Sequence, residues 1–442
     1  MHTRSTVALA VVSGAVFCVL AESGSVAQAD LITVGRLNSS SRDRAIQFLK
    51  NRDVDGARNE VEKTTAADPN SPHPEVVLAD LLLQVGNPTM GVSVLEAVAA
   101  SEPERFDIRF AFCAMALRQR RWFDCWTHIA SCEKAPMPKS WSPAHQQLAK
   151  SELRSVKARC SEGRKDWMLA RKLYQAILKE TLHGRSPQTR QQALSGHARA
   201  LFHLGELNAC FESFSTLSSE NPAVGPAELM VAQLFDETGE LDKAEEWFSK
   251  AARKSPRQAS IVYARWLIWN NFPEKVDELL ANYPRAPEPQ PRLPESEYLR
   301  ILSLRMRREF GRARQILDSL SDQYPDSRSL ANQLALVLIE SDDAEQRTKA
   351  LKLAERATRK APANAEAWAT LGWVHLQLGN VQQAQQSLDK AVRGGKLSRD
   401  AAFYLGALNS KLGNRLKASE FYSAARNANG PFFYPHLMPT DK

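Results

Sequence analysis

After its first 29 residues, the sequence has no apolar run long enough to cross a membrane as a helix. The longest apolar run of the whole chain, residues 7–21, lies before that point and spans 15 residues. A membrane helix needs about 20. Arg4 precedes this run, and Ala27-Gln28-Ala29 follows it. This is the layout of a secretory signal peptide over residues 1–29. We expect an exported protein, periplasmic or extracellular, without a transmembrane segment after cleavage; the alternative is an uncleaved anchor.

Motifs for catalysis or cofactor binding are also missing. The sequence has no phosphate-binding loop, zinc-protease helix, nucleophile elbow or dinucleotide-binding turn. Gly394-Gly395-Lys396 lacks the earlier glycine and the following Ser or Thr of a phosphate loop. Without C-x-x-C or C-x-x-C-H, neither a thioredoxin-like site nor covalent haem is indicated. We therefore expect no enzyme, no catalytic or cofactor-binding residues and no cofactor.

What the chain does have is enough apolar sequence for a large core, and a pattern that repeats. Its 442 residues are 43 % hydrophobic and 24 % charged, which is typical of a folded chain. Similar residues recur at an interval of 34, the signature of stacked repeats. The recurring pairs include Leu371 and Leu405, Gly372 and Gly406, Gly379 and Gly413, Phe214 and Phe248, and Pro222 and Pro256.

One unit of this pattern, residues 365–398, predicts two short antiparallel helices. One face of a first helix carries Trp368, Leu371 and His375 at i, i+3 and i+7. One face of a second carries Ala384, Leu388 and Ala391 at i, i+4 and i+7. Gly379 between them suits a tight turn, because glycine adopts positive φ without steric cost. Such a hairpin cannot cover its own apolar face, so each one must pack against the next.

The spacing W-x2-L-G, followed by A-x3-[LFY]-x2-A and a closing proline, resembles the tetratricopeptide repeat. The best matches are residues 365–398, 399–430, 225–258 and 191–224. The resemblance implies an all-α fold, a right-handed superhelical solenoid of antiparallel helix pairs with about eleven repeats. It also implies a scaffold that binds a protein or peptide partner in its concave groove.

Breaks in the pattern divide the chain. Five prolines between Tyr283 and Glu295 cannot lie inside helices and predict a stiff connector. Phe432, Phe433 and Tyr434 are expected to fold back as a cap on the last repeat, or to serve as a docking peptide. The expected segments are a signal peptide at 1–29, a linker at 30–37, degenerate repeats at 38–184, central repeats at 191–283, the connector at 284–294, C-terminal repeats at 295–430 and a tail at 431–442.

Aligning the repeats places several Arg and aromatic residues on the face that lines the groove in tetratricopeptide arrays. Such residues dominate binding hot spots. The alternative is that they pack inside the array. The predicted partner-binding residues are Arg159, Arg199, Phe202, Tyr298, Trp373 and Phe403.

Positive charge is concentrated in residues 104–190. This stretch carries 18 Lys and Arg against eight Asp and Glu, in a chain of net charge +8. Its field favours acidic protein segments, anionic polysaccharide or lipid headgroups, and export argues against nucleic acid. An alternative function is therefore a cell-envelope assembly factor that binds anionic polysaccharide through residues 104–190. A basic but idle solvated surface is the other interpretation.

The cysteines allow three interpretations. Cys125, His128 and Cys132 share one helical face, and with Cys113 they could hold zinc, which would make the chain a metalloprotein. In the repeat alignment, however, the three cysteines take the places of small buried residues, so we expect them to pack in the core and expect no metal ligands. A Cys113–Cys125 disulfide is the third interpretation, since export would permit it.

Overall fold

The computed structural model describes residues 39–181, 186–281, 283, 293–394 and 397–439. The predicted signal peptide and nearly all of the predicted connector lie outside these residues. Every regular element in the described chain is a helix, and the described residues contain no strand. The all-α prediction is therefore confirmed. None of the described helices is both long and apolar enough to span a membrane.

In the described chain, 22 α-helices follow one another as eleven pairs, which confirms the expected number of repeats; the superhelical handedness stays a prediction. Short 3-10 turns follow α11 (η1, Pro222–Val224), precede α15 (η2, Pro273–Lys275) and lie in the tail (η3, Pro435–Leu437). The pairs are α2 (Ser39–Lys50) with α3 (Val54–Ala66), α4 (Pro74–Gln84) with α5 (Pro88–Ser101), α6 (Phe106–Arg118) with α7 (Trp122–Lys134), α8 (Pro143–Gly163) with α9 (Trp167–Thr181), α10 (Pro187–His203) with α11 (Leu207–Glu220), α12 (Ala227–Glu237) with α13 (Leu241–Lys254), α14 (Pro256–Trp269) with α15 (Val276–Ala281), α16 (Glu295–Met306) with α17 (Phe310–Gln323), α18 (Arg328–Leu338) with α19 (Ala344–Lys360), α20 (Ala365–Gln377) with α21 (Val381–Arg393), and α22 (Arg399–Lys411) with α23 (Arg415–Asn427).

The turn within a pair is built on a residue of positive φ. Ten of the eleven turns have one, close to 55–85°. Glycine accepts this conformation without a Cβ clash, and other residues adopt it at a cost. The residues are Gly86, Gly205, Gly239, Gly379 and Gly413 in five turns, and Arg52, Arg120, Lys165, Asn271 and Arg308 in five others.

First and second helices of a pair are buried differently. α20 buries eight of its 13 residues, whereas its partner α21 buries only four. First helices also contact one another along the array, as α6 with α8, α8 with α10, and α20 with α22. A Cβ on Gly372 would lie 2.5 Å from Leu388 Cγ, so only glycine lets α20 approach α21 this closely. We call the side of the first helices that is turned away from their second-helix partners the first-helix face.

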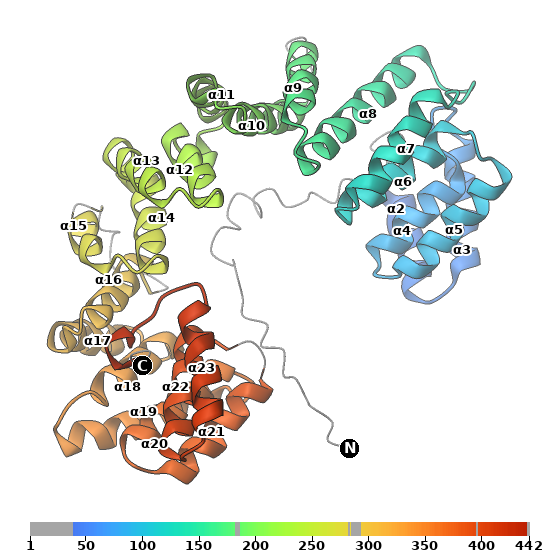
Figure 1. Ribbon diagram of the computed structural model, residues 1–442. Helices are drawn as coiled ribbons and strands as arrows, with labels where there is room; N and C mark the ends of the chain where they lie inside the picture. The colour runs from blue at the N-terminus through green and yellow to red at the C-terminus, as the bar shows by residue number, and fades with distance from the viewer. Residues whose placement is uncertain (1–38, 182–185, 282, 284–292, 395–396, 440–442) are drawn as a thin grey trace. The chain divides into compact units, whose positions relative to one another are not determined.

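The chain divides into two compact units at residue 244. The N-terminal unit, described from residue 39, holds α2 to α12 and the start of α13; the C-terminal unit holds the rest. Figure 1 shows helical hairpins stacked side by side within each unit. The largest hydrophobic cluster of the C-terminal unit runs from Ile301 to Tyr434, so it includes both repeats and tail.

Candidate functional site

Three predicted groove residues lie on two adjacent first helices of the N-terminal unit. Arg159 is on α8 and is exposed, while Arg199 and Phe202 are on α10 and are half-buried. Lys157 and Arg164, on the opposite side of α8, stand over the ring of Trp126 in the second helix α7. Arg159 therefore points away from the second helices and belongs to the first-helix face.

The repeat register relates these residues to their counterparts in the C-terminal unit. Arg159, Arg199 and Trp373 each stand six residues before the positive-φ turn residue of their own pair, namely Lys165, Gly205 and Gly379. They therefore occupy equivalent places on their helices. In the same way, Phe202 and Arg305 stand three residues before their turns, and Tyr298 and Phe403 stand ten residues before theirs.

Arg199 is held by a partly buried network that the sequence did not reveal. Its Nε donates to Glu162 Oε1 of α8 at 2.5 Å, and its Nη1 donates to Ser195 Oγ at 2.9 Å. The hydroxyl of Tyr174 on α9 donates to Glu162 Oε2 at 2.7 Å. Burial opposes the charge of Arg199, but the Glu162 carboxylate outweighs it and raises the pKa of Arg199. The network fixes this guanidinium on the first-helix face.

A close approach of helices explains where Tyr174 lies. A Cβ on Gly196 of α10 would fall 2.2–2.7 Å from the ring atoms of Tyr174, so glycine opens the space that the ring fills. Burial raises the pKa of Tyr174 well above its ordinary value, and the Glu162 carboxylate adds to this. The tyrosine is therefore a neutral hydrogen-bond donor. The sequence feature that indicates the position of the Tyr174 ring is the glycine at position 196, in the next repeat.

Phe202 extends the surface toward α12. Its ring packs edge-on against Phe235 with a centroid distance of 4.8 Å and against His203 at 5.4 Å. His203 in turn stacks on Trp167 of α9 at 3.9 Å. The half-buried Phe202 is thus anchored by aromatic neighbours while part of its ring stays accessible.

The other three predicted residues lie in the C-terminal unit, where two of them are buried and Tyr298 is half-buried. Trp373 and Phe403 are each 2 % exposed and touch the ring of Tyr434 in the tail. Tyr298 is half-buried, and its hydroxyl accepts a hydrogen bond from Gln333 Nε2 at 3.2 Å. The tail therefore covers Trp373 and Phe403, whereas the other four predicted residues stay at least partly exposed.

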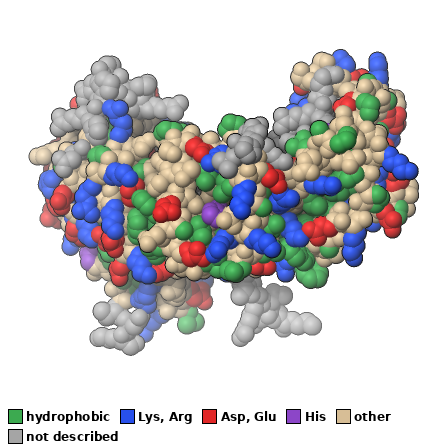
Figure 2. Space-filling view, turned by 90° about the horizontal axis from the view of Figure 1, so that it is seen from above, with side chains coloured by type: hydrophobic (Ala, Val, Ile, Leu, Met, Phe, Trp, Pro, Cys, Tyr) green, Lys and Arg blue, Asp and Glu red, His purple; other side chains and the backbone are tan. Residues whose placement is uncertain are grey.

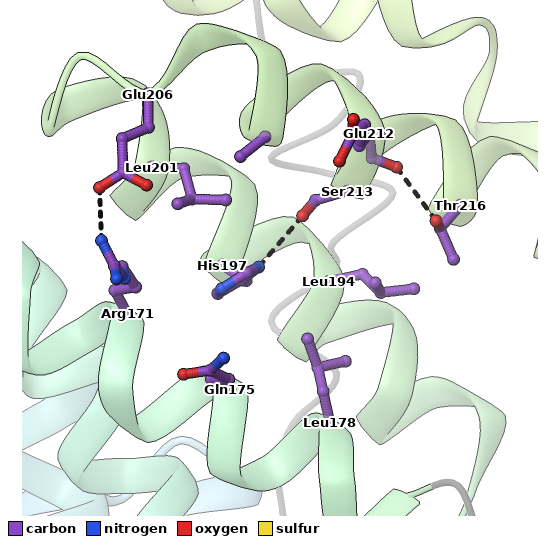
Figure 3. A pocket seen from close by; sticks show the side chains of 11 residues that line it. Arg171, Gln175, Leu178, Leu194, His197, Leu201, Glu206, Glu212, Ser213 and Thr216 are labelled. Carbon is purple, nitrogen blue, oxygen red and sulfur yellow. Dashed lines mark hydrogen bonds and ion pairs between the residues drawn. The ribbon is translucent and has the colours of Figure 1, made fainter.

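An open pocket of about 390 Å³ lies elsewhere, between α9, α10 and α11 (Figure 3). None of the six predicted residues lines it. His197 and Ser213 meet across it, with 3.1 Å between Nδ1 and Oγ, and Arg171 pairs with Glu206 at its edge. Burial lowers the pKa of His197, and Arg171 lowers it further.

The Ser213–His197 pair is half of the arrangement that activates a serine nucleophile. The other half is an acid that orients the imidazole. Among the described residues no carboxylate hydrogen-bonds to His197, and Glu206 is held by Arg171. Ser213 also lies inside α11, where backbone N–H groups are used by the helix and cannot stabilise an oxyanion. The geometry favours a packing contact.

Part of the basic stretch 104–190 is paired within the fold. Four of its partners, Asp80, Glu102, Glu206 and Glu220, come from outside the stretch, so its local surplus is smaller than the sequence suggests. On the face of the molecule drawn in Figure 2, Lys and Arg side chains are interspersed with Asp and Glu side chains. The pairs are Arg105 with Glu102 and Asp107, Arg118 with Asp80, Arg121 with Asp124, Arg154 with Glu180, Lys157 with Glu133, Arg171 with Glu206, and Arg190 with Glu220.

The cysteines on α6 and α7 are buried free thiols. Cys113 Sγ lies 3.5 Å from Cys132 Sγ, while the thiol of Cys125 points to the carbonyl oxygen of Cys113. His128 stacks on Phe112 with a centroid distance of 5.3 Å. In the described residues, no group of three or more His, Cys, Asp or Glu side chains is placed to hold a metal ion.

A family model supports the repeat assignment over part of the chain. A family model described as "Tetratricopeptide repeat" matches residues 343–408. No curated protein matches the sequence significantly. Among solved structures, MamA (residues 41 to the end) from Desulfovibrio magneticus is 20 % identical, with 37 % of this chain and 89 % of that chain covered and a TM-score of 0.28.

Two further solved structures cover more of the chain. A tetratricopeptide repeat protein from Parabacteroides merdae is 12 % identical, with 66 % of this chain and 94 % of that chain covered and a TM-score of 0.34. Yeast Tom70 is 12 % identical, with 88 % of this chain and 95 % of that chain covered and a TM-score of 0.33.

Proposed function

We propose that this tetratricopeptide repeat protein is a non-enzymatic scaffold that binds a protein or peptide partner through the first-helix face of α8 and α10. The observation that carries the proposal is Arg159. Its side chain is exposed and has no ion pair among the described residues, whereas the neighbouring Arg199 is fixed by Glu162. An exposed arginine beside an anchored one and a half-buried aromatic, Phe202, is the composition of a binding hot spot.

The repeat register supports the same surface. Trp373, which is equivalent to Arg159 and Arg199, contacts a non-helical segment of polypeptide in the C-terminal unit. With arginines in that place, the α8–α10 surface favours a segment that carries carboxylates, since arginine pairs with them through two parallel hydrogen bonds. The acidic character of the partner is part of the proposal.

The test is a pair of charge reversals on one helix. Arg159→Glu places a negative charge on the first-helix face of α8. Lys150→Glu makes the same change nine residues earlier, two and a half turns away and hence on the opposite side; Lys150 is also exposed. The partner is identified by cross-linking in the native compartment and then purified. We expect its Kd to rise at least tenfold (about 1.4 kcal/mol) with Arg159→Glu and less than twofold with Lys150→Glu.

Equal losses with both variants would contradict the proposed surface. If both variants also reduce retention on an anionic polysaccharide column, with steep salt dependence, the polysaccharide-binding alternative through residues 104–190 is favoured instead. The ion pairs described above reduce the positive surplus on which that alternative depends, because four of the paired carboxylates come from outside the stretch.

We further propose that the scaffold is exported and that residues 1–29 are removed. The support is the order of a basic start, a 15-residue apolar run and Ala27-Gln28-Ala29. Intact-mass measurement of the protein from its source cell should give a chain that begins at Asp30. A chain that keeps Met1 in a cytoplasmic fraction would overturn this proposal, and one that keeps it in a membrane fraction would favour the anchor.

A further inference from the structure

The tail of the chain lies on the first-helix face of the C-terminal unit. After α23 the chain leaves the repeats and runs back across α22 toward α16 and α14 (Figure 1). Phe432, Phe433 and Tyr434 are 6 %, 8 % and 4 % exposed. These three aromatic residues therefore fill a groove that the repeats build.

Side chains of the groove hold the tail by its backbone. Asn271, in the turn after α14, donates from Nδ2 to Gly430 O at 3.3 Å and accepts from Phe432 N at Oδ1, at 2.9 Å. Arg399 donates to Gly430 O at 3.1 Å, and Asp400 accepts from Phe433 N at 3.2 Å. A side-chain amide that pairs with both a carbonyl and an N–H satisfies backbone groups of a segment that forms neither helix nor strand. None of these bonds needs the covalent link to α23.

Each aromatic ring of the tail has its own place. The Phe432 ring lies under the Arg399 guanidinium at 4.7 Å, and the Phe433 ring under the Arg305 guanidinium at 4.0 Å. Tyr434 packs between rings of α20 and α22, parallel to Phe403 at 5.3 Å and tilted on Trp373 at 5.0 Å. Its hydroxyl lies 3.4 Å from that of Tyr404. Three consecutive aromatic residues are thus recognised one by one.

The groove floor contains buried charges. Arg305 and Asp400 are 3 % and 7 % exposed, and Arg305 donates to Gln333 Oε1 at 2.5 Å. Burying charges is an inefficient way to stabilise a permanent core, because desolvation offsets much of their attraction. Charged groups that meet a peptide backbone and its rings are instead typical of a binding groove.

The tail leaves the outer side of the last pair uncovered. Leu416 on α23 is 85 % exposed, and Leu412 just before it is 39 % exposed. A terminal cap would cover such apolar side chains on the last helix. The tail instead reaches Asn271, about 160 residues earlier in the chain.

We propose that the first-helix face of the C-terminal unit is a binding site for a non-helical peptide with consecutive aromatic side chains, and that residues 430–434 occupy it as a displaceable intramolecular ligand. A partner segment of the same chemistry binds there by displacing the tail. The site is separate from the α8–α10 surface, so either proposal can fail while the other stands.

Tethering makes the tail a strong competitor. A short flexible connection gives an effective concentration in the millimolar range. A free peptide therefore meets a groove that is filled nearly all the time. Cutting the connection after folding removes this advantage and leaves every groove residue unchanged.

The experiment inserts a specific protease site after the exposed Asn429 of the full chain and cleaves it once the protein has folded. A fluorescein-labelled peptide of residues 430–439 is then added, and its anisotropy is measured. We expect saturable binding to the cut chain, and binding at least 100-fold weaker to the uncut chain. A peptide with Phe433→Ala and Tyr434→Ala should bind the cut chain at least tenfold more weakly. A peptide with Leu437→Ala should bind equally, since Leu437 is 47 % exposed.

Two results would overturn the proposal. In the first, the cut tail stays bound during gel filtration and does not exchange with excess labelled peptide within a day. In the second, it leaves and the protein loses helical circular dichroism, which would make the tail a permanent part of the core. Exchange with unchanged helicity supports the proposal. Asn271→Ala in the cut chain then tests the backbone contacts, with a fivefold or greater loss of peptide affinity expected.

Discussion

At the scale of single residues, Asp400 is the most consequential group in the described chain. It is buried, and burial raises the pKa of its carboxyl to about 7, against the opposing effect of Arg305 and of the Phe433 N–H. Glu366 on α20 raises the pKa further, and Arg399 lowers it. The carboxyl therefore changes charge near neutral pH while it holds the tail.

This shift predicts how stability depends on pH. A carboxyl whose pKa is higher in the folded than in the unfolded protein keeps its proton longer when folded, so folding is favoured most at low pH. The free energy of unfolding should fall as the pH rises from 5 to 7, by an amount on the order of 2 kcal/mol, and level off above that. Urea unfolding of wild type and Asp400→Asn at pH 5, 6, 7 and 8 measures this. A pH dependence that is the same in both proteins would contradict it.

The thiols of the N-terminal unit provide a second residue-scale prediction. The hydrogen bond with Cys132 and burial raise the pKa of Cys113, so its thiolate is scarce and oxidation is slow. Under prolonged diamide treatment two protons and two electrons pass from the thiols to diamide, and the 3.5 Å neighbours Cys113 and Cys132 should form the disulfide. Peptide mapping checks the pairing, with the isolated Cys210 as the thiol that stays reduced. A dominant Cys113–Cys125 product would contradict the structure.

At the scale of elements, the turns between paired helices have one conformation built from different residues. Five turns place Gly at the positive-φ position and five place Arg, Lys or Asn there. The packing of the two helices thus requires a positive φ at this position. Only five of these turns have glycine, the residue that adopts it without steric cost.

Arg120 therefore carries backbone strain that glycine would relieve. Its φ is 55°, and its side chain is exposed. Arg120→Gly should raise the free energy of unfolding relative to Arg120→Ala by about 1 kcal/mol, because both lose the side chain but only glycine removes the Cβ clash. Denaturant unfolding of the two variants measures the difference. Equal stabilities would show that the turn is not strained.

The sequence was most informative about the helices and the way they pair. The 34-residue interval predicted helix pairs because each repeat buries the same places, such as Gly372 against Leu388. Turns built on Arg120 or Lys165 could not be recognised in the sequence. An Arg or Lys with positive φ cannot be told from any other solvent-exposed Arg or Lys. The alignment of the repeats predicted which residues lie on the first-helix face. It did not predict which of these residues are exposed.

At the scale of the whole molecule, the contacts that decide which surface is free are the least predictable. Asn271 meets Phe432 across 161 residues, and no local pattern links them. Trp373 and Phe403 were predicted to be available for a partner, yet the tail covers them. Likewise, the charge surplus of residues 104–190 is reduced by carboxylates from flanking helices. Arg159 stays open because nothing in the described chain pairs with it.

The central claim, that the open first-helix face of α8 is where a partner binds, is tested most directly by photo-crosslinking in the source cell. A benzophenone amino acid replaces Arg159 in one variant and Lys150 in another, two and a half turns apart on the same helix. We predict one dominant covalent protein adduct from position 159 that is absent or at least tenfold weaker from position 150. Adducts of equal yield from both positions, or an adduct from position 150 alone, would contradict it.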